Sequence, residues 1–469
     1  MSTTLSTSNT SFNHFMPNNA SQTDPSLLKN VLVITPISLI GRAGTFLIYV
    51  ALANWFGDPV EMDFIYYYWG IAIFLIELLS AASAYSVLVP LLAEARAKGE
   101  TEARRCVQSI FSRYITVMPW LCCLLVAISW TISQRFLPDA QLSSVATISI
   151  VCGFLCFTII ASVRWMLKAI LDTYQAFQLP VIIQAFRAVI VIAIIYLGKP
   201  SLTWFSIPLA LILGELFQVI VLFPRCCTVL NLQVRHLKLT LQETPYTKQF
   251  LHQCLLMMGA AIADGINPVV DRGMGSTLGA SSVSKLDYAL RLCAIPETLT
   301  GVTLPVLLSH WAKISSSELQ SKNGSTANDA ELQRSVWRGV VALFVLMAPF
   351  LAGFYLFREN IVSILFGHGE LSEAGQSHIA SLLGIYLLGM LPRLMSRLLI
   401  RAHLARQAHR TVVTATLIRL VLNPFLNYLF MRYWGLEGIA WSTALLSYPI
   451  LAYIAITFWW GQRNRQTKP

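Results

Sequence analysis

The chain has 469 residues, of which 55% are hydrophobic and only 12% are charged, against roughly 25% charged residues in a typical soluble domain. This shortage of charge, with a mean hydropathy of +0.61, argues against a water-soluble fold and excludes a disordered chain and a coiled coil. The net charge of +11 is too thinly spread for a nucleic-acid binder, so the expected class is a polytopic membrane protein.

Apolar stretches of membrane-spanning length recur along the chain, six on each side of a polar interval. Because a spanning helix needs about 20 apolar residues, twelve spans use about 240 residues and leave room for short loops and tails. We therefore expect an all-α polytopic membrane protein with about 12 transmembrane helices in two six-helix lobes. The stretches lie near residues 31–55, 64–93, 114–133, 143–170, 179–198, 203–224, 250–278, 284–310, 337–357, 378–400, 411–431 and 438–460.

The two ends and the middle of the chain are more polar than the spans. Residues 1–28 are rich in Ser, Thr and Asn and contain no Lys or Arg, which predicts a disordered cytoplasmic tail and not a signal peptide. Residues 225–249 mix aliphatic and basic side chains, which predicts an amphipathic cytoplasmic linker on the membrane surface. The remaining expected units are an N-terminal lobe at 29–224, a C-terminal lobe at 250–461 and a cytoplasmic tail at 462–469.

Basic residues are distributed unequally between alternate loops. With the amino terminus in the cytoplasm, that side collects 21 Lys and Arg residues, and the opposite side holds at most six. Because cytoplasmic loops carry an excess of Lys and Arg, we expect a multi-pass protein of the cytoplasmic (inner) membrane with both termini cytoplasmic.

The two halves share internal spacings. One is a spacing of eight residues from Pro to Lys, and the other is a spacing of twelve residues from Gln to Arg. Their recurrence in the same order favours a parallel internal repeat, an arrangement that transporters use to build two access states around a central site. The paired positions are Pro90 and Lys98 with Pro305 and Lys313, and Gln175 and Arg187 with Gln407 and Arg419.

Ionisable side chains inside the spans are the main candidates for function, because each is costly in the bilayer and usually faces a partner, a cavity or a substrate. Arginine predominates among them, and its forked, permanently charged guanidinium suits a phosphate or pyrophosphate. The candidate substrate-binding arginines are Arg42, Arg187, Arg272 and Arg291, and the candidates for ion coupling or charge pairing are Glu77, Asp264, Asp271 and Asp287.

Helical spacing gathers some of these residues on common faces. Residues seven apart share a helix face, so two polar stripes are expected to face inward. Alternative roles remain open: Arg187 is equally expected to pair with Glu215, and Glu77 and Asp264 could simply neutralise arginines. The aromatic run 66–69 is expected to form an interfacial belt. The two stripes are Asp63, Gly70 and Glu77 on the second span, and Ser284, Asp287 and Arg291 on the eighth.

Signatures of catalysis and of metal binding are missing from the sequence. It contains no GxxxxGK[ST] loop and no HExxH motif, and its eight histidines lack ligand spacing. We therefore expect a transporter and not an enzyme, with no cofactor and no metal site. Coupling to Na⁺, to H⁺ or to the membrane potential remains open.

Several short segments are distinctive in sequence and spacing. They are Arg42 with Phe56-Gly57 and Asp63-Phe64, Val89-Pro90-Leu91-Leu92-Ala93-Glu94, Ala169-Ile170-Leu171-Asp172-Thr173-Tyr174, Ile266-Asn267, Asp271-Arg272, Ser282-Val283-Ser284, Tyr288-Ala289, Arg291-Leu292, Ile295-Pro296 and Leu365-Phe366-Gly367-His368-Gly369. In these segments the chain resembles the MurJ/MviN family of lipid II flippases. The resemblance implies membership of the multidrug/oligosaccharidyl-lipid/polysaccharide exporter superfamily and the movement of a polyprenyl-diphosphate-linked saccharide to the outer leaflet.

The resemblance also implies roles for particular positions. Arg42, Asp63, Ser284 and Arg291 match residues that the family uses in its central cavity. Ile48 stands where the family usually has a second arginine in the first span, and Ile76-Glu77 replaces its arginine pair in the second. The glycan is therefore lipid II or a related lipid-linked oligosaccharide.

The expected mechanism is alternating access, in which the pyrophosphate pairs with Arg42 and Arg291 while the lipid tail stays in the bilayer. Partners would be the lipid-linked glycan, the bilayer, and glycan polymerases or glycosyltransferases, with no nucleic acid. The alternative function is an ion-coupled antiporter for organic cations or drugs, with Glu77 and Asp264 as binding residues. A membrane-embedded glycan polymerase or acyltransferase would need a catalytic His or a large loop with acidic residues, and neither is evident.

Overall fold

The computed structural model describes residues 25–136, 143–232, 244–301, 326–406 and 408–466, and the regular structure in these ranges is helical. Its elements are α1 (Pro25–Phe56), α2 (Val60–Ile76), the π-helix η1 (Glu77–Tyr85), α3 (Ser86–Lys98), α4 (Glu100–Phe136), α5 (Ser144–Thr173), α6 (Gln178–Leu202), the short η2 (Thr203–Phe205), α7 (Ser206–Val229), α8 (Pro245–Gly275), the short η4 (Ser276–Leu278), α9 (Ser282–Gly301), α11 (Thr326–Leu356), α12 (Arg358–Phe366), α13 (Glu373–Ala405) and α14 (His409–Gln466).

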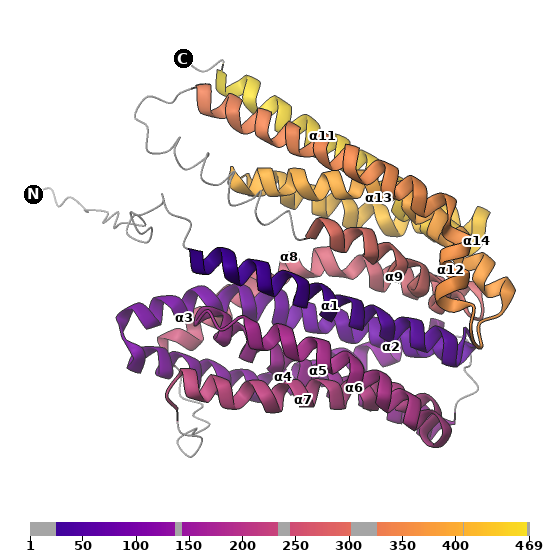
Figure 1. Ribbon diagram of the computed structural model, residues 1–469, viewed down its shortest axis with the longest axis horizontal. Helices are drawn as coiled ribbons and strands as arrows, with labels where there is room; N and C mark the ends of the chain where they lie inside the picture. The colour runs from indigo at the N-terminus through magenta and orange to yellow at the C-terminus, as the bar shows by residue number, and fades with distance from the viewer. Residues whose placement is uncertain (1–24, 137–142, 233–243, 302–325, 407, 467–469) are drawn as a thin grey trace, which may run out of the picture.

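The helices lie roughly side by side in two groups (Figure 1). The first bundle comprises α1–α7, and the second bundle comprises α8, α9 and α11–α14. Within the second bundle, α8 packs against α14, and it also packs against α2, η1 and α4 of the first bundle. In Figure 1, α1 begins and α14 ends on the left of the molecule, so the described ends of the chain share one side.

Eight helical runs among the described residues are long and apolar enough to cross a membrane. Two of them, Gln178–Val229 and Arg410–Trp460, have 52 and 51 residues, far more than the roughly 20 that one crossing needs. The first run turns back at η2 between α6 and α7, and the second bends at Gly435, whose φ of 55° and ψ of −129° are not helical. The expectation of an all-helical polytopic membrane protein is confirmed.

Element boundaries differ from the expected ones in several places. The expected span 64–93 is divided between α2, η1 and α3. Helix α1 begins at Pro25, inside the expected tail, and α14 continues to Gln466. Both ends of the expected surface linker belong to other helices: α7 runs to Val229, and α8 begins at Pro245. Residues 233–243 of the expected linker and the tail residues 1–24 and 467–469 lie outside the described residues.

The aromatic run of α2 does not form the expected interfacial belt. Tyr66, Tyr67, Tyr68 and Trp69 are all buried in the core. Tyr66 and Trp69 stack with their ring centroids 5.9 Å apart, and such pairs contribute beyond simple area burial. The run is buried because α2 is enclosed by α5, α8 and α9, so it packs the junction between the bundles and does not face lipid headgroups.

The two bundles are joined at the end opposite the described chain ends, on the right of Figure 1. There Asn54 Nδ2 donates to the carbonyl of Leu365 over 2.8 Å, and the backbone N–H of Glu370 donates to the carbonyl of Asn54 over 2.9 Å. Gly57 adopts φ +69°, and a Cβ there would lie 2.8 Å from the Glu370 carbonyl oxygen. Glycine is therefore required where the α1–α2 turn meets the α12–α13 turn.

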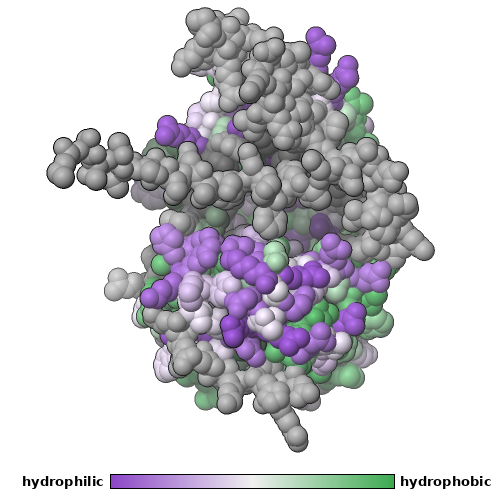
Figure 2. Space-filling model, turned by 90° about the vertical axis from the view of Figure 1, so that its left-hand side faces the viewer, coloured by the Kyte–Doolittle hydropathy of each residue, from purple (hydrophilic) through white to green (hydrophobic). Residues whose placement is uncertain are grey.

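The opposite end of the first bundle is polar. Figure 2, which views the molecule from the left of Figure 1, shows hydrophilic residues gathered over this bundle's described surface. Exposed ion pairs at the α3–α4 turn include Lys98 with Glu94 at 2.8 Å and Arg105 with Glu102 at 2.8 Å. This distribution is typical of a loop surface in water.

Candidate functional site

Two arginines share one carboxylate where α8 and α9 face each other. Arg272 Nε donates to Asp287 Oδ1 over 3.0 Å, and Arg291 Nε donates to Asp287 Oδ2 over 3.1 Å. The Asp287 side chain is fully buried, whereas 26% of the Arg291 side chain is exposed. The cluster therefore carries two positive charges against one negative charge, and its more exposed member is Arg291.

Neighbouring residues hold these two guanidinium groups in place. Tyr49 of α1 lies under Arg291, with the guanidinium carbon 4.1 Å from the ring centroid, a favourable cation–π arrangement. A Cβ at Gly70 of α2 would lie 2.8 Å from Arg272 Cδ, so the missing side chain there makes room for Arg272. The predicted inward stripe of α2 is correct at Gly70, because this residue faces the arginine cluster.

Arg42 lies on the same face of α1 as Tyr49, because the two residues are seven positions apart. At 1.5 Å per residue the separation along the helix axis is about 10 Å. Tyr49 is buried, whereas Arg42 is exposed. The face of α1 that packs under Arg291 therefore becomes accessible at Arg42, toward the end at which α1 begins.

Asp63 and Ser284 are buried against each other. The backbone N–H of Ser284 donates to Asp63 Oδ1 over 2.7 Å, and the two residues are 1% and 0% exposed. Ser284 is the third residue of α9, so Asp63 caps the first turn of that helix from the other bundle. This differs from the expectation that both residues line the central cavity.

Arg187 is paired within the first bundle. Its Nε lies 2.9 Å from Glu215 Oε1, and Arg164 Nε lies 2.5 Å from Glu215 Oε2. Glu215 is buried, so one carboxylate of α7 joins α5 and α6. The geometry favours the structural alternative for Arg187 over direct contact with substrate.

Asp271 is buried in the second bundle and receives its hydrogen bonds from neutral side chains. Asn423 Nδ2 and Asn427 Nδ2 donate to Asp271 Oδ1 over 2.7 and 2.6 Å. Thr443 Oγ1 lies 3.5 Å from Asp271 Oδ2, and Ser442 donates to Asn427 Oδ1. This network brings together α8 and the two arms of α14 around one carboxylate.

The other two acidic candidates are less well defined. Glu77 begins the π-helix η1 and is exposed, and a Cβ at Gly265 of α8 would lie 3.9 Å from its Oε2. Glu77 therefore faces α8, on the side that the heptad spacing predicted. Asp264 lies in α8, but its side chain is outside the described part of the structure.

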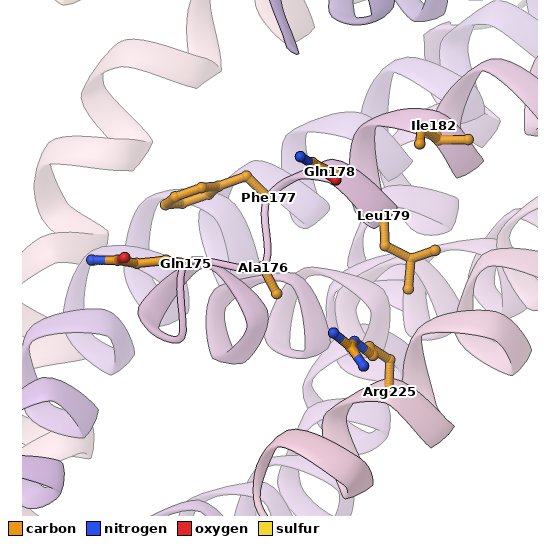
Figure 3. A pocket seen from close by; sticks show the side chains of 7 residues that line it. All are labelled: Gln175, Ala176, Phe177, Gln178, Leu179, Ile182 and Arg225. Carbon is orange, nitrogen blue, oxygen red and sulfur yellow. The ribbon is translucent and has the colours of Figure 1, made fainter. Parts of the chain in front are cut away.

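Two cavities lie away from the Arg272–Arg291 cluster. One, of about 210 Å³, lies between helices of the second bundle and is lined by polar and basic residues. The other, of about 520 Å³, lies where the α5–α6 turn meets the end of α7. Figure 3 shows Arg225 rising from α7 toward this turn. A single basic side chain makes the second cavity a poorer match for a doubly phosphorylated group.

Sequence reasoning identified the arginines but missed several residues around them. Tyr49 had no distinguishing signal in an apolar, aromatic-rich span. Asn423 and Asn427 did have one, since they are amides four residues apart on one face of an otherwise apolar helix. Glu297, which contacts Arg393 and Arg397 at 3.0 and 2.8 Å, was also missed.

A family model described as "Lipid II flippase MurJ" matches residues 52–467 of the chain. The chain belongs to the MurJ family of lipid II flippases. A curated "Lipid II flippase MurJ" from Burkholderia cenocepacia is 24% identical over 429 residues, which is 89% of this chain and 81% of that protein. The resemblance read from the sequence is thereby confirmed, and the family consists of membrane transporters and not enzymes.

Solved structures support the same fold assignment. A lipid II flippase MurJ in an inward closed conformation gives a TM-score of 0.72 at 20% identity, covering 91% of this chain and 87% of the other. An inward-facing multidrug resistance MATE family transporter of the MOP superfamily gives 0.74 at 13% identity, covering 94% and 100%. At such identities the likeness shows the fold, which the MurJ family shares with MATE transporters.

Proposed function

We propose that this chain moves a polyprenyl-diphosphate-linked saccharide, lipid II or a related lipid-linked oligosaccharide, from the inner to the outer leaflet. The observation that carries the proposal is the Arg272–Asp287–Arg291 cluster. One carboxylate balances one of its two guanidinium charges, so one positive charge remains for an anionic ligand. The partly exposed Arg291 provides forked donors of the kind that bind phosphate oxygens.

Arg42 extends this site along the face of α1 that leads from Tyr49. Because the exposed Arg42 and the partly exposed Arg291 both adjoin this face, a diphosphate between the bundles would meet both residues. Asp63, Ser284 and Arg187 then act indirectly, by fixing the helices that carry the site. The isoprenoid tail would stay in the bilayer throughout.

The proposed cycle is alternating access between two six-helix lobes with twelve spans in all, related by an internal repeat and with both termini in the cytoplasm. Contacts of Asn54 with the α12–α13 turn close the end that we assign to the outside. The opposite, polar end is then the cytoplasmic entrance. Substrate binding would favour release of the outer contacts and opening to the other side.

Two sources of energy suit this cycle. With the cytoplasm negative, outward movement of an anionic headgroup is favoured by about 2.3 kcal/mol per charge at 100 mV. A coupling ion is the second source, and Asp271 is its best candidate, because its hydrogen-bond donors in the described structure are neutral side chains. Na⁺ or H⁺ would neutralise this buried carboxylate and so change the packing of α8 against α14.

Substitutions at Arg291 test the diphosphate site. Purified Arg291→Glu should lose binding of a polyprenyl-diphosphate-linked saccharide, and Arg291→Gln should weaken it by about 10- to 100-fold, since hydrogen bonds to charged groups contribute about 1.5–3 kcal/mol. Binding would be measured by titration of the lipid into detergent-solubilised protein, with gel filtration as the check on folding.

The control is Arg291→Lys, which keeps the charge but not the fork and should retain intermediate affinity. Wild-type affinity in a folded Arg291→Glu variant would remove the proposed role of this residue. The antiporter alternative predicts a different pattern, in which Glu77→Gln abolishes drug resistance in cells while glycan-lipid binding is unaffected.

A further inference from the structure

Aromatic side chains connect the arginine cluster to the contacts that join the bundles at the outer end. Tyr49 of α1, which lies under Arg291, stacks on Trp69 of α2 with the ring centroids 4.9 Å apart. Trp69 also stacks on Tyr66, one turn earlier in α2. The interplanar angles of these two pairs are 17° and 6°, so the three rings of the first bundle are nearly parallel.

The second bundle continues this arrangement. Tyr288 of α9 meets Tyr66 edge to face with the centroids 5.2 Å apart, and it contacts Phe366, the last residue of α12, over 5.4 Å. Its hydroxyl donates to the carbonyl of Gly57 over 2.8 Å. The buried rings therefore extend from Arg291 to the turns that meet at the outer end. They form one aromatic cluster, which comprises Tyr49, Tyr66, Trp69, Tyr288 and Phe366.

Two contacts of the aromatic cluster cross between the bundles. One is the edge contact of Tyr66 with Tyr288, and the other is the cation–π contact of Tyr49 with Arg291. Both must separate if α1 and α2 are to move away from α9. Only the second depends on a full charge, because the ring quadrupole attracts the guanidinium electrostatically. A change of charge at Arg291 therefore changes how strongly the bundles are joined.

An anion bound at Arg291 would make such a change. The Arg272–Asp287–Arg291 cluster carries one more positive charge than its carboxylate balances, and 26% of the Arg291 side chain is exposed. A bound phosphate group would neutralise this excess charge, so the attraction of Arg291 to the Tyr49 ring would decrease. Tyr49 is 4% exposed, and cation–π contacts are stronger when they are desolvated. Loss of this contact therefore favours separation of the bundles.

We propose that Tyr49 is a positioning residue that couples occupancy of the diphosphate site to opening of the outer end. Without ligand, its ring holds Arg291 of the second bundle against α1, and the bundles stay joined. A bound diphosphate weakens this contact and so lowers the free energy of opening. The proposal rests on the proposed function, because it takes a diphosphate lipid as the ligand of Arg291.

The test measures opening of the outer end by double electron–electron resonance between spin labels at Ser201 of α6 and Glu359 of α12. Both residues are exposed, and they belong to different bundles. The protein, with its nine natural cysteines replaced, is studied in nanodiscs with and without a polyprenyl-diphosphate-linked saccharide. We expect the lipid to raise the ratio of open to closed molecules.

Tyr49→Leu keeps an apolar side chain but removes the ring. Without lipid, it should raise the open-to-closed ratio about three- to tenfold, the change expected for loss of a buried cation–π contact. The effect of the lipid on this ratio should fall by the same factor, and the lipid should bind more tightly, because coupling between binding and opening is reciprocal. Tyr49→Phe keeps the ring and should match wild type in all three measurements.

Two further variants separate charge from structure. Pentafluorophenylalanine at Tyr49 keeps the shape of the ring but reverses its quadrupole, so it should reproduce the effects of Tyr49→Leu even where the leucine variant does not fold. Tyr288→Phe removes the hydrogen bond to Gly57 and leaves the Tyr49–Arg291 contact unchanged. It should raise the open-to-closed ratio without lipid, while the lipid still changes that ratio by the wild-type factor.

The outcomes distinguish this proposal from the proposed function. If the lipid binds wild type but changes the open-to-closed ratio of Tyr49→Leu and of wild type by the same factor, the coupling role of Tyr49 is excluded and the proposed function stands. Binding without any change of the wild-type ratio excludes the coupling role as well. Absence of lipid binding to wild type would overturn the proposed function and this proposal together.

Discussion

Asp271 and Asp287 are both buried carboxylates of the second bundle, but their surroundings give them different roles. Asp287 is held between two guanidinium groups, so its charge is balanced within the protein, and its removal would leave Arg272 and the partly exposed Arg291 without this counterion. Asp271 receives hydrogen bonds from neutral side chains. A carboxylate with neutral donors is the better place for a cation or a proton to bind and leave.

Asp271→Asn tests this difference. The substitution preserves shape but removes the negative charge, so the dependence of Tm on sodium concentration and on pH should be lost or much reduced. Glu77→Gln is the matched control, and it should leave both dependences as in wild type. An undiminished sodium and pH response in a folded Asp271→Asn protein would exclude this residue as the coupling site.

Single residues could be selected from the sequence because of what charge costs in a membrane. That criterion identified Arg272, Asp287 and Arg291, which the structure joins in one cluster. It could not assign the partners of Asp271, since Asn423 is 152 positions away in the sequence and belongs to a different helix. Distant pairings of this kind depend on helix packing, which a single sequence does not reveal.

The start of α9 shows how one helix can connect the two bundles. Asp63 of α2 accepts the N–H of Ser284 in its first turn, and an anionic cap is favoured at a helix N-terminus. Nearby, Tyr288 donates to the carbonyl of Gly57 over 2.8 Å, and Lys285 lies 3.3 Å from Asp58 Oδ2. This contact between the bundles is therefore a set of polar interactions that can be broken and remade.

Asp63→Ala should weaken this contact. Loss of an N-cap acceptor costs about 0.5–2 kcal/mol, so Tm should fall by a few degrees and the outer end should open more often. Asp63→Asn keeps an acceptor of similar capping strength and should stay close to wild type in both respects. Measured by differential scanning fluorimetry, equal Tm values for the alanine variant and wild type would contradict the capping role.

Elements were predicted best where apolar length and heptad spacing agree. The inward stripe of α2 was found, because Asp63 and Gly70 both face the second bundle. The π-helix η1 and the burial of the aromatic run were not predicted. Neither a change of helical pitch nor the enclosure of α2 by three other helices leaves a periodic signal in the sequence. The bend of α14 lies at Gly435, in a backbone conformation that glycine adopts readily.

At the scale of the whole molecule, the helical membrane fold and the family could be predicted, whereas the number of crossings rests on the repeat. Helices α8 and α9 are not among the eight apolar runs of the described residues, because they carry the ionisable residues of the site. The polarity of these residues weakens the hydropathy signal of both helices. In the internal repeat expected from the sequence, their counterparts in the first bundle are α1 and α2, and on that expectation we count them as spans.

In the proposed mechanism the Arg42 face of α1 borders a water-accessible space between the bundles, which a diphosphate lipid enters from the cytoplasm. Thr45 lies on this face between Arg42 and Tyr49, whereas Leu47 lies on another side of α1 and is 51% exposed. Cysteine introduced at each position, in a variant with the nine natural cysteines replaced, reports whether the side chain meets water or lipid.

The deciding measurement is the labelling of these two cysteines with a membrane-impermeant thiol reagent in inverted and right-side-out membrane vesicles. We expect Thr45→Cys to react in inverted vesicles and to be protected by a polyprenyl-diphosphate-linked saccharide but not by the polyprenol alone, while Leu47→Cys stays unreactive. Labelling of Leu47→Cys with no reaction at Thr45→Cys, or labelling of Thr45→Cys without any protection by the diphosphate lipid, would contradict the account.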